Sequence, residues 1–174
     1  GRAVPGPYPK APVSRLFLHE SGRFKLDWEN SRRLAEIGMV SGAVFSDFDG
    51  DGEADLVLAC EWGPVRVFRN ERWTFREITS DLGLDQHRGW WNGVATGDFD
   101  GDGHLDIVAT NWGRNTKYER HRAQPLSLFY GQFNGDGLTQ VFEAYFEPAL
   151  GKVVPWRDLA SAAQDVPWVR KKFA

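Results

Sequence analysis

The sequence has little of what most catalytic sites and disulfide-rich proteins depend on. It contains one cysteine and four histidines among 174 residues. The cysteine, Cys60, has no partner for an internal disulfide, and we expect it to act as a small buried hydrophobic side chain. The histidines are scattered, and no motif of a catalytic nucleophile accompanies them. We therefore expect a protein that is not an enzyme.

The chain also lacks a long apolar run and a surplus of positive charge. No stretch approaches the roughly 20 apolar residues that a membrane-spanning helix needs. The formal net charge is −3, so no basic face for nucleic acid is expected. The one methionine is Met39, and we expect the chain to begin within a longer protein or after processing. The length suits one domain with a substantial core.

Carboxylates are abundant at two places, and both have the pattern of a calcium-binding loop. The first loop is Asp47-Phe48-Asp49-Gly50-Asp51-Gly52-Glu53-Ala54-Asp55, and a near-copy begins 51 residues later at Asp98. Aspartates occupy loop positions 1, 3, 5 and 9, and a glycine at position 6 permits a sharp turn. Calcium takes about six to eight oxygen ligands, and alternate residues of a tight loop can direct carboxylates to one point. Without a cation, these carboxylates would repel one another.

We therefore predict two Ca²⁺ sites, each held by four aspartates and the backbone carbonyl of loop position 7. A carbonyl ligand at that position explains why its side chain differs between the loops. The predicted ligand residues are Asp47, Asp49, Asp51, Glu53 and Asp55 for one ion, and Asp98, Asp100, Asp102, His104 and Asp106 for the other.

The loops could also be EF-hands or hairpin turns without an ion. An EF-hand requires a glutamate at position 12 and a helix on each side, but position 12 is Leu58 or Ala109. The flanks are strand-like, as in 43–45 and 56–58, which disfavours the EF-hand. The second alternative is an Asp/Gly-rich hairpin turn without an ion, and the repetition of all four carboxylates argues against it.

The loops are part of a longer repeat, with units at about 15–65 and 66–116 and a degenerate unit at 126–146. Each unit would run hairpin, connector, strand, loop, strand. A period of this length with four short strands is typical of a β-propeller. We therefore predict an all-β fold, a partial β-propeller of about three four-stranded antiparallel blades with calcium-binding hairpin loops. The matched pairs are Arg15/Arg66, Phe17/Phe68, Phe24/Phe75 and Gly42/Gly93.

The segments outside the repeat have a different character. Residues 1–14 hold four of the nine prolines and are predicted to be an irregular arm. Residues 147–174 are predicted to form a helical C-terminal segment, with one helix over 156–163 that begins near Pro155 and a helical turn at its end. We expect the propeller to continue beyond the chain. Residues 30–36 fit either one helical turn or a polar loop.

Two segments carry candidates for ligand binding. In the connector of the second unit, His87 and Arg88 precede Trp90 and Trp91, and the pair of tryptophans would suit a sugar or another ligand. Alternatively, one of these tryptophans fills the gap between blades. Residues 112–124 are polar and basic, and we predict a long surface loop that is either solvated or in contact with an anionic partner.

A third loop, Gln132 to Gln140, keeps the Asn-Gly-Asp-Gly turn but has lost the carboxylates at positions 1, 3 and 9. Only Asp136 supplies a formal charge there. Because calcium affinity depends on the number of charged ligands, we predict that this loop keeps its turn and binds no metal.

The units Gly42-Ala43-Val44-Phe45-Ser46-Asp47 and Gly93-Val94-Ala95-Thr96-Gly97-Asp98, each leading into Asp-x-Asp-Gly-Asp-Gly-x-x-Asp, resemble the FG-GAP/VCBS repeat family. The resemblance covers about 15–146. Members look like calcium-stabilised β-propellers and are usually secreted, periplasmic or cell-surface proteins. The chain is further similar to the cartilage acidic protein/ASPIC–UnbV-like group through Asn111-Trp112-Gly113-Arg114-Asn115, Phe142-Glu143-Ala144-Tyr145 and residues 166–173.

The resemblance implies a calcium-binding module for recognition or adhesion outside the cell or at its surface, with a protein or glycan ligand and structural metal ions. A structural propeller domain beside a catalytic one, and a carbohydrate-active enzyme, are the alternatives. Three blades do not close a ring, because propellers have about four to eight. We therefore expect other blades or self-association to cover apolar residues such as Phe17, Phe24, Phe129 and Tyr130.

Overall fold

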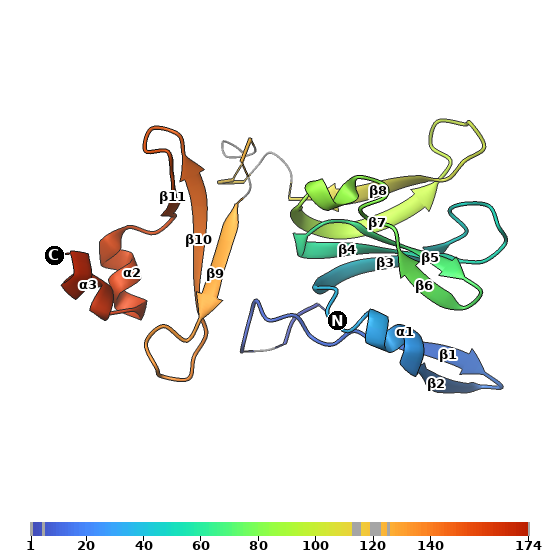
Figure 1. Cartoon of the computed structure of the whole chain (residues 1–174), viewed down its shortest axis with the longest axis horizontal. Coiled ribbons are helices and arrows are strands. Elements are labelled where there is room, and N and C mark those ends of the chain that lie inside the picture. Colours follow the sequence, from blue (N-terminus) through green and yellow to red (C-terminus); the bar gives the residue numbers. More distant parts are fainter. Residues whose placement is uncertain (1, 5, 113–115, 119–122, 125, 174) are drawn as a thin grey trace. The chain divides into compact units, whose positions relative to one another are not determined.

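Strands form most of the regular structure in the computed structural model (Figure 1), and every strand pair among the described residues is antiparallel. The structure describes residues 2–4, 6–112, 116–118, 123–124 and 126–173. The chain divides into two compact units, one of Gly1–Ala3 and Lys10–Trp112 and the other of Val4–Pro9 and Gly113–Ala174. The prediction of an all-β architecture with a few short helices is confirmed.

The first unit begins with a hairpin and a helix. Strands β1 (Leu16–Glu20) and β2 (Arg23–Asp27) pair with each other and form a separate two-stranded sheet. Helix α1 (Trp28–Arg33) follows at once, because the Asp27 side chain accepts a hydrogen bond from the Asn30 backbone N–H at 3.0 Å and caps the helix. Residues 30–36, which fit either a helical turn or a polar loop by sequence, are therefore helical at their start.

Asn30 fixes this helix against the next sheet. Its side chain is 1% exposed, accepts a hydrogen bond from the Phe75 backbone N–H at 2.9 Å and donates to the Trp73 carbonyl at 2.7 Å. A buried amide with both ends paired is stabilising, whereas an unpaired one would be costly. Asn30 therefore connects the connector helix to a strand more than 40 residues away.

A four-stranded antiparallel meander follows and has the strand order predicted for one blade. It consists of β3 (Met39–Ser46), β4 (Asp55–Gly63), β5 (Arg66–Glu71) and β6 (Thr74–Glu77), each paired with the next (Figure 1). The first aspartate loop joins β3 to β4. This meander contains most of the buried apolar residues of the unit.

Strand β4 is buried on both faces, and its side chains alternate between two core clusters. Leu56, Leu58 and Cys60 face one cluster, and Val57 faces the other, as the twofold period of a strand requires. Segments that precede the meander cover the first face, and segments that follow it cover the second. The first cluster also holds Leu34, Ile37, Phe68 and Phe75, and the second holds Val65, Val67 and Ile78 with Val44, Leu84, Trp91, Val94, Ile107 and Ala109 packed against it.

The strands β7 (Gly89–Gly97) and β8 (Asp106–Asn111) follow a short 3-10 helix, η1 (Leu84–Gln86), and flank the second aspartate loop. The prediction that Trp90 and Trp91 lie in a connector is wrong, because both belong to β7. Trp90 pairs with Glu61 of β4, and Trp91 pairs with Asn111 of β8. These long-range pairings extend the strand further toward the N-terminus than its apolar pattern indicates.

The matched glycines of the repeat meet each other. A Cβ placed on Gly42 would lie 3.0 Å from the Gly93 Cα and 3.3 Å from the Val94 backbone nitrogen. Next to them, the Ser41 hydroxyl donates to the Trp91 carbonyl at 2.5 Å. The backbones of β3 and β7 therefore approach closely, and the absence of a side chain at Gly42 is what allows it.

The second unit holds a three-stranded sheet in the order β11-β10-β9 and two helices. Its strands are β9 (Ser127–Gly131), β10 (Gln140–Glu147) and β11 (Lys152–Pro155), and its helices are α2 (Leu159–Asp165) and α3 (Trp168–Phe173). The basic segment predicted at 112–124 falls largely outside the described residues.

The predicted start of the C-terminal helix near Pro155 is wrong. Pro155 ends β11, and the next residue, Trp156, still donates its backbone N–H to the Glu143 carbonyl at 2.8 Å. The helix begins after Asp158, whose side chain accepts from the Ser161 N–H at 2.7 Å and supplies the cap. The strand pairing thus extends past the proline that the sequence suggested as a helix start.

Gly42→Ala should destabilise the protein by roughly 1–3 kcal/mol, because the new methyl group would press on backbone atoms that have little room to move. Urea unfolding at fixed free calcium measures the change. Gly93→Ala is the matched control, since its Cβ would meet only the Thr110 hydroxyl, at 3.4 Å. Equal effects of the two substitutions would contradict the close approach at Gly42.

Candidate metal centre

The last aspartate of the first loop binds the backbone at the start of the loop and the backbone of a neighbouring strand. Asp55 begins β4 and is 2% exposed. One of its oxygens accepts from the Phe48 N–H at 3.0 Å, and the other accepts from the Asn70 N–H at 2.8 Å. Asp55 therefore fastens the loop to its own start and to the neighbouring strand β5.

Three carboxylates converge within this loop. Asp47, Asp49 and Asp55 each present an oxygen, and these oxygens lie within 4.8 Å of one another. The Oδ2 atom of Asp47 accepts from the Gly52 N–H at 3.0 Å, but its Oδ1 atom is buried and has no hydrogen-bond partner. A buried carboxylate oxygen without a partner is costly. A hard cation such as Ca²⁺ among these oxygens fits this donor set and would remove that cost.

The second loop repeats the arrangement. Asp98, Asp100 and Asp106 again present oxygens within 4.8 Å of one another. Asp106 accepts from the Phe99 N–H at 3.0 Å, as Asp55 does from Phe48. Asp98 accepts from the Gly103 N–H at 3.0 Å, and the φ of Gly103 is +88°. The left-handed backbone at this position requires the glycine that the sequence supplies.

The other predicted ligands lie at positions 5 and 7. Asp51 and Asp102 are outside the groups of three, and each accepts a hydrogen bond from the position-7 N–H at 2.8 Å. Glu53 accepts from the Arg72 N–H at 3.1 Å, so its side chain is directed to the turn between β5 and β6. His104 is exposed. Coordination by these four residues, like that by the other six, stays a prediction.

A positively charged side chain that the sequence pattern does not indicate, Arg69, lies beside the first loop. The Arg69 Nε atom lies 2.7 Å from the Asp49 Oδ2 atom, and the arginine side chain is 40% exposed. Arg69 is on β5, 20 residues from Asp49, and no local pattern links the two residues. The Nε atom makes no hydrogen bond, so the contact is an ion pair, and its positive charge would oppose a metal ion at Asp49 by repulsion.

In the third loop, a glutamine stands in place of the last aspartate. Gln140 accepts from the Phe133 N–H at 2.8 Å, in the place of Asp55 and Asp106. Its amide nitrogen donates to Asn134 Oδ1 at 3.1 Å and to Asp136 Oδ1 at 3.2 Å. The amide N–H groups therefore do what a cation would do for these oxygens. Hydrogen bonds from the Leu138 N–H and from the Asn134 and Gln140 side chains lower the pKa of Asp136.

The candidate ligand residues His87, Arg88, Trp90 and Trp91 do not form one platform. Trp91 packs against the core cluster around Val57, and its Nε1–H donates to the His87 carbonyl at 3.1 Å. Trp91 therefore contributes to the core of the first unit, and the alternative that a tryptophan fills the gap between blades stays a prediction. The His87 and Arg88 residues are exposed.

The Trp90 ring instead packs against two tryptophans that the sequence did not indicate as ligand candidates. Its ring stacks on Trp112, with centroids 3.9 Å apart and planes at 19°. The Trp62 ring lies 5.1 Å from Trp90 at 60°. The three come from β4, from β7 and from the residue that follows β8, so only the strand register, which the sequence leaves undetermined, brings them together.

A comparison with known families supports the repeat. The profile of the FG-GAP-like repeat family matches residues 15–109, which is more than half of the chain and includes both aspartate loops. No curated protein and no solved structure gives a significant match. The segments behind the narrower ASPIC–UnbV-like resemblance lie outside the matched range, so that grouping stays a prediction. On the matched range, the chain belongs to the FG-GAP-like repeat family.

Proposed function

We propose that this protein is a calcium-stabilised, β-propeller-type module that binds a protein or glycan ligand outside the cell or at its surface. The observation that carries the calcium part is the buried, unpaired Oδ1 atom of Asp47 within a group of converging carboxylates. A second loop with the same spacing and the same group of three supports it.

The ions would be structural. Each loop joins two neighbouring strands, β3 to β4 or β7 to β8, and its last aspartate is the first residue of the following strand. An ion would draw the loop's carboxylates together at the end of a hairpin. Ion binding would therefore stabilise the folded sheet and couple folding to calcium.

The binding part of the proposal follows from the family. FG-GAP repeats are typical of β-propeller-type modules of extracellular and cell-surface proteins, and such domains commonly mediate protein interactions. None of the described helices is long and apolar enough to cross a membrane. We propose a recognition role without catalysis.

We further propose that the propeller is completed by additional blades or by self-association. Phe17 is 50% exposed and Phe24 is 77% exposed on the first hairpin. Phe129 and Tyr130 on β9 are 54% and 53% exposed. Aromatic side chains in this position favour burial against a further sheet.

Calcium should stabilise the chain, and chelation should lower its melting temperature. At a free calcium concentration of 100 times Kd, each site contributes about 2.7 kcal/mol. Isothermal titration should show two ions per chain, and Asp100→Ala should reduce this to one. Asp136→Ala in the third loop is the control and should leave two. A melting temperature that does not respond to a chelator would refute the calcium sites.

Arg69→Gln should raise the calcium affinity of the first loop, because Asp49 would lose the competing guanidinium 2.7 Å away. Asp100→Ala removes the second site, so the affinity of the first can be measured in that background. The expected gain is about two- to fivefold, since a partly exposed ion pair contributes about 0–1 kcal/mol. Unchanged or weaker binding would show that Arg69 does not compete.

The third loop should bind calcium only after its carboxylates are restored. Gln140→Asp removes the amide nitrogen that bridges Asn134 and Asp136, and Gln132→Asp adds the charge at position 1. The double variant should titrate with a third ion, whereas Gln132→Asp alone should not. A third ion in the unmodified chain would contradict the role given to Gln140.

A further inference from the structure

The turn between β5 and β6 has a backbone conformation that its own residues do not favour. Glu71 pairs with Thr74, so Arg72 and Trp73 are the two central residues of a tight hairpin turn. Their φ angles are +53° and +69°. Two-residue turns with both φ angles positive favour Asn-Gly or Gly-Gly, because a Cβ atom makes the left-handed region costly. Contacts from outside the turn therefore hold it in this conformation.

These contacts come from the first aspartate loop, from β5 and from helix α1. The Arg72 N–H donates to the Glu53 Oε2 atom at 3.1 Å. The Trp73 N–H donates to Asn70 Oδ1 at 2.8 Å, and the Trp73 carbonyl accepts from the Asn30 side chain at 2.7 Å. Side chains of three different segments thus bind the backbone of the turn.

Asn70 is itself bound to the first loop. Its backbone N–H donates to Asp55 Oδ1 at 2.8 Å, and its side-chain amide donates to the Ala54 carbonyl at 3.1 Å. With Glu53, loop positions 7, 8 and 9 therefore each supply an acceptor to this end of the hairpin. Glu53 through its carbonyl and Asp55 through its carboxylate are also predicted calcium ligands. The order of the turn therefore depends on the order of the loop.

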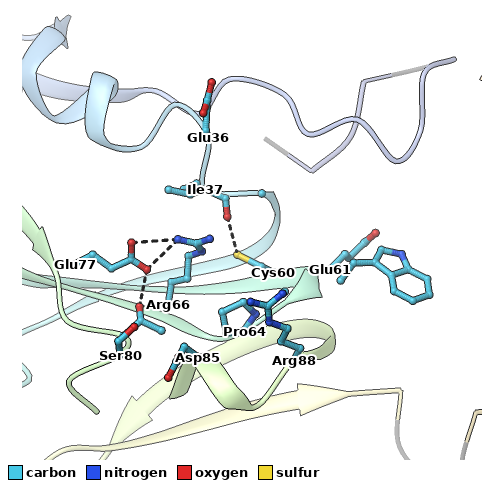
Figure 2. A pocket seen from close by; sticks show the side chains of 14 residues that line it. Glu36, Ile37, Cys60, Glu61, Pro64, Arg66, Glu77, Ser80, Asp85 and Arg88 are labelled. Atoms are coloured by element: carbon cyan, nitrogen blue, oxygen red, sulfur yellow. Dashed lines mark hydrogen bonds and ion pairs between the residues drawn. The ribbon is translucent and has the colours of Figure 1, made fainter. Parts of the chain in front are cut away.

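The other end of the hairpin is held without the loop. Figure 2 shows Arg66 of β5 paired with Glu77 of β6, and the hydrogen bonds between them are 2.9 and 3.1 Å long. The Thr79 hydroxyl accepts from the Val67 N–H at 3.1 Å and donates to Glu77 at 2.8 Å. Within the hairpin, an effect of the loop should therefore be largest at the turn.

The second loop lacks this connection within the part of the chain that the structure describes. The N–H groups that donate to its aspartates all belong to the loop itself, within 99–104. At position 7, where Glu53 reaches the turn, the second loop has the exposed His104. At position 9, Asp55 is 2% exposed, whereas Asp106 is only partly buried. The two loops share a ligand pattern and differ in what they are attached to.

We propose that the first aspartate loop and the β5–β6 turn form one calcium-responsive element, and that the second loop has no such effect. When its carboxylates are neutralised, the first loop keeps positions 7 to 9 in place and holds Arg72 and Trp73 in their left-handed conformation. Without a cation, repulsion among the carboxylates loosens the loop, and the turn loses its acceptors. Trp73, which is 74% exposed, is then held in one position only while the loop is occupied. The proposal deepens the calcium function proposed above and rests on it for the presence of the ion.

The test follows the backbone amide signals of the 174-residue chain by NMR, with calcium and with a chelator. Chelation should move the Arg72 and Trp73 signals toward the positions of an unstructured chain, and should move the Val67 signal less. Asp100→Ala removes the second site and should leave this response intact. Asp49→Ala, the matched substitution in the first loop, should abolish it.

Two substitutions of Glu53 separate the hydrogen bond from the charge. Glu53→Ala keeps the backbone carbonyl of position 7 and removes the acceptor of the Arg72 N–H. Glu53→Gln removes the same charge but keeps an oxygen that can accept. Because a weakened turn weakens ion binding by the same factor, the first site should bind calcium about two- to fivefold more weakly in the alanine variant than in the glutamine variant. His104→Ala, at position 7 of the second loop, should leave the Arg72 signal unchanged.

Calorimetry on the same samples counts the bound ions and gives their affinities. Two bound ions without movement of the Arg72 and Trp73 signals would overturn the coupling and leave the calcium sites standing. Equal calcium affinities of the two Glu53 variants would also overturn it, and this comparison holds even if chelation unfolds the whole chain. No bound ion would refute the calcium function and the coupling with it.

Discussion

The buried carboxylate of Asp55 is the interaction on which the first unit depends. It stands where a nine-residue loop becomes the central strand of the sheet, and its two oxygens bind the Phe48 and Asn70 N–H groups. A charge that is 2% exposed needs more than neutral donors to offset its desolvation. The convergence of Asp47 and Asp49 on the same point adds repulsion that a divalent cation would turn into attraction. A cation bound in the loop would thus be coupled to the sheet through one residue.

The third loop shows that the turn itself does not need the ion. Gln140 reproduces the hydrogen bond of Asp55 to the loop backbone, and its amide nitrogen satisfies the oxygens of Asn134 and Asp136. A neutral amide carries both an acceptor and donors, whereas a carboxylate carries only acceptors. In the third loop, glutamine at position 9 therefore satisfies oxygens that, in the other two loops, a cation would satisfy.

The sequence predicted what is local and missed what depends on register. The aspartates converge within nine residues of chain, so spacing alone was enough to place Asp47, Asp49 and Asp55 together. Strand periodicity likewise located β3, β4, β7 and β8. By contrast, Arg69, Trp62 and Trp112 reach their partners across strand pairs, and no spacing rule anticipates such contacts. The start of β7 at Gly89 was missed for the same reason, since it pairs with Gly63 of β4. The prediction that 147–174 is helical is wrong at 152–155, because β11 forms a hairpin with β10 there.

The two ends of β4 face the same electrostatic problem and differ in where the positive charge comes from. Asp55 begins the strand and Glu61 lies near its end, and both carboxylates are buried. At Asp55, the loop gathers more acidic groups, and a cation from solution would add to the positive charge that Arg69 places beside Asp49. At Glu61, the chain supplies Arg2 from an irregular arm, with most of its side chain exposed. Arg2 thus pairs with the buried carboxylate near the end of β4, whereas at its start the carboxylates of the aspartate loop converge in a way that a bound cation would stabilise.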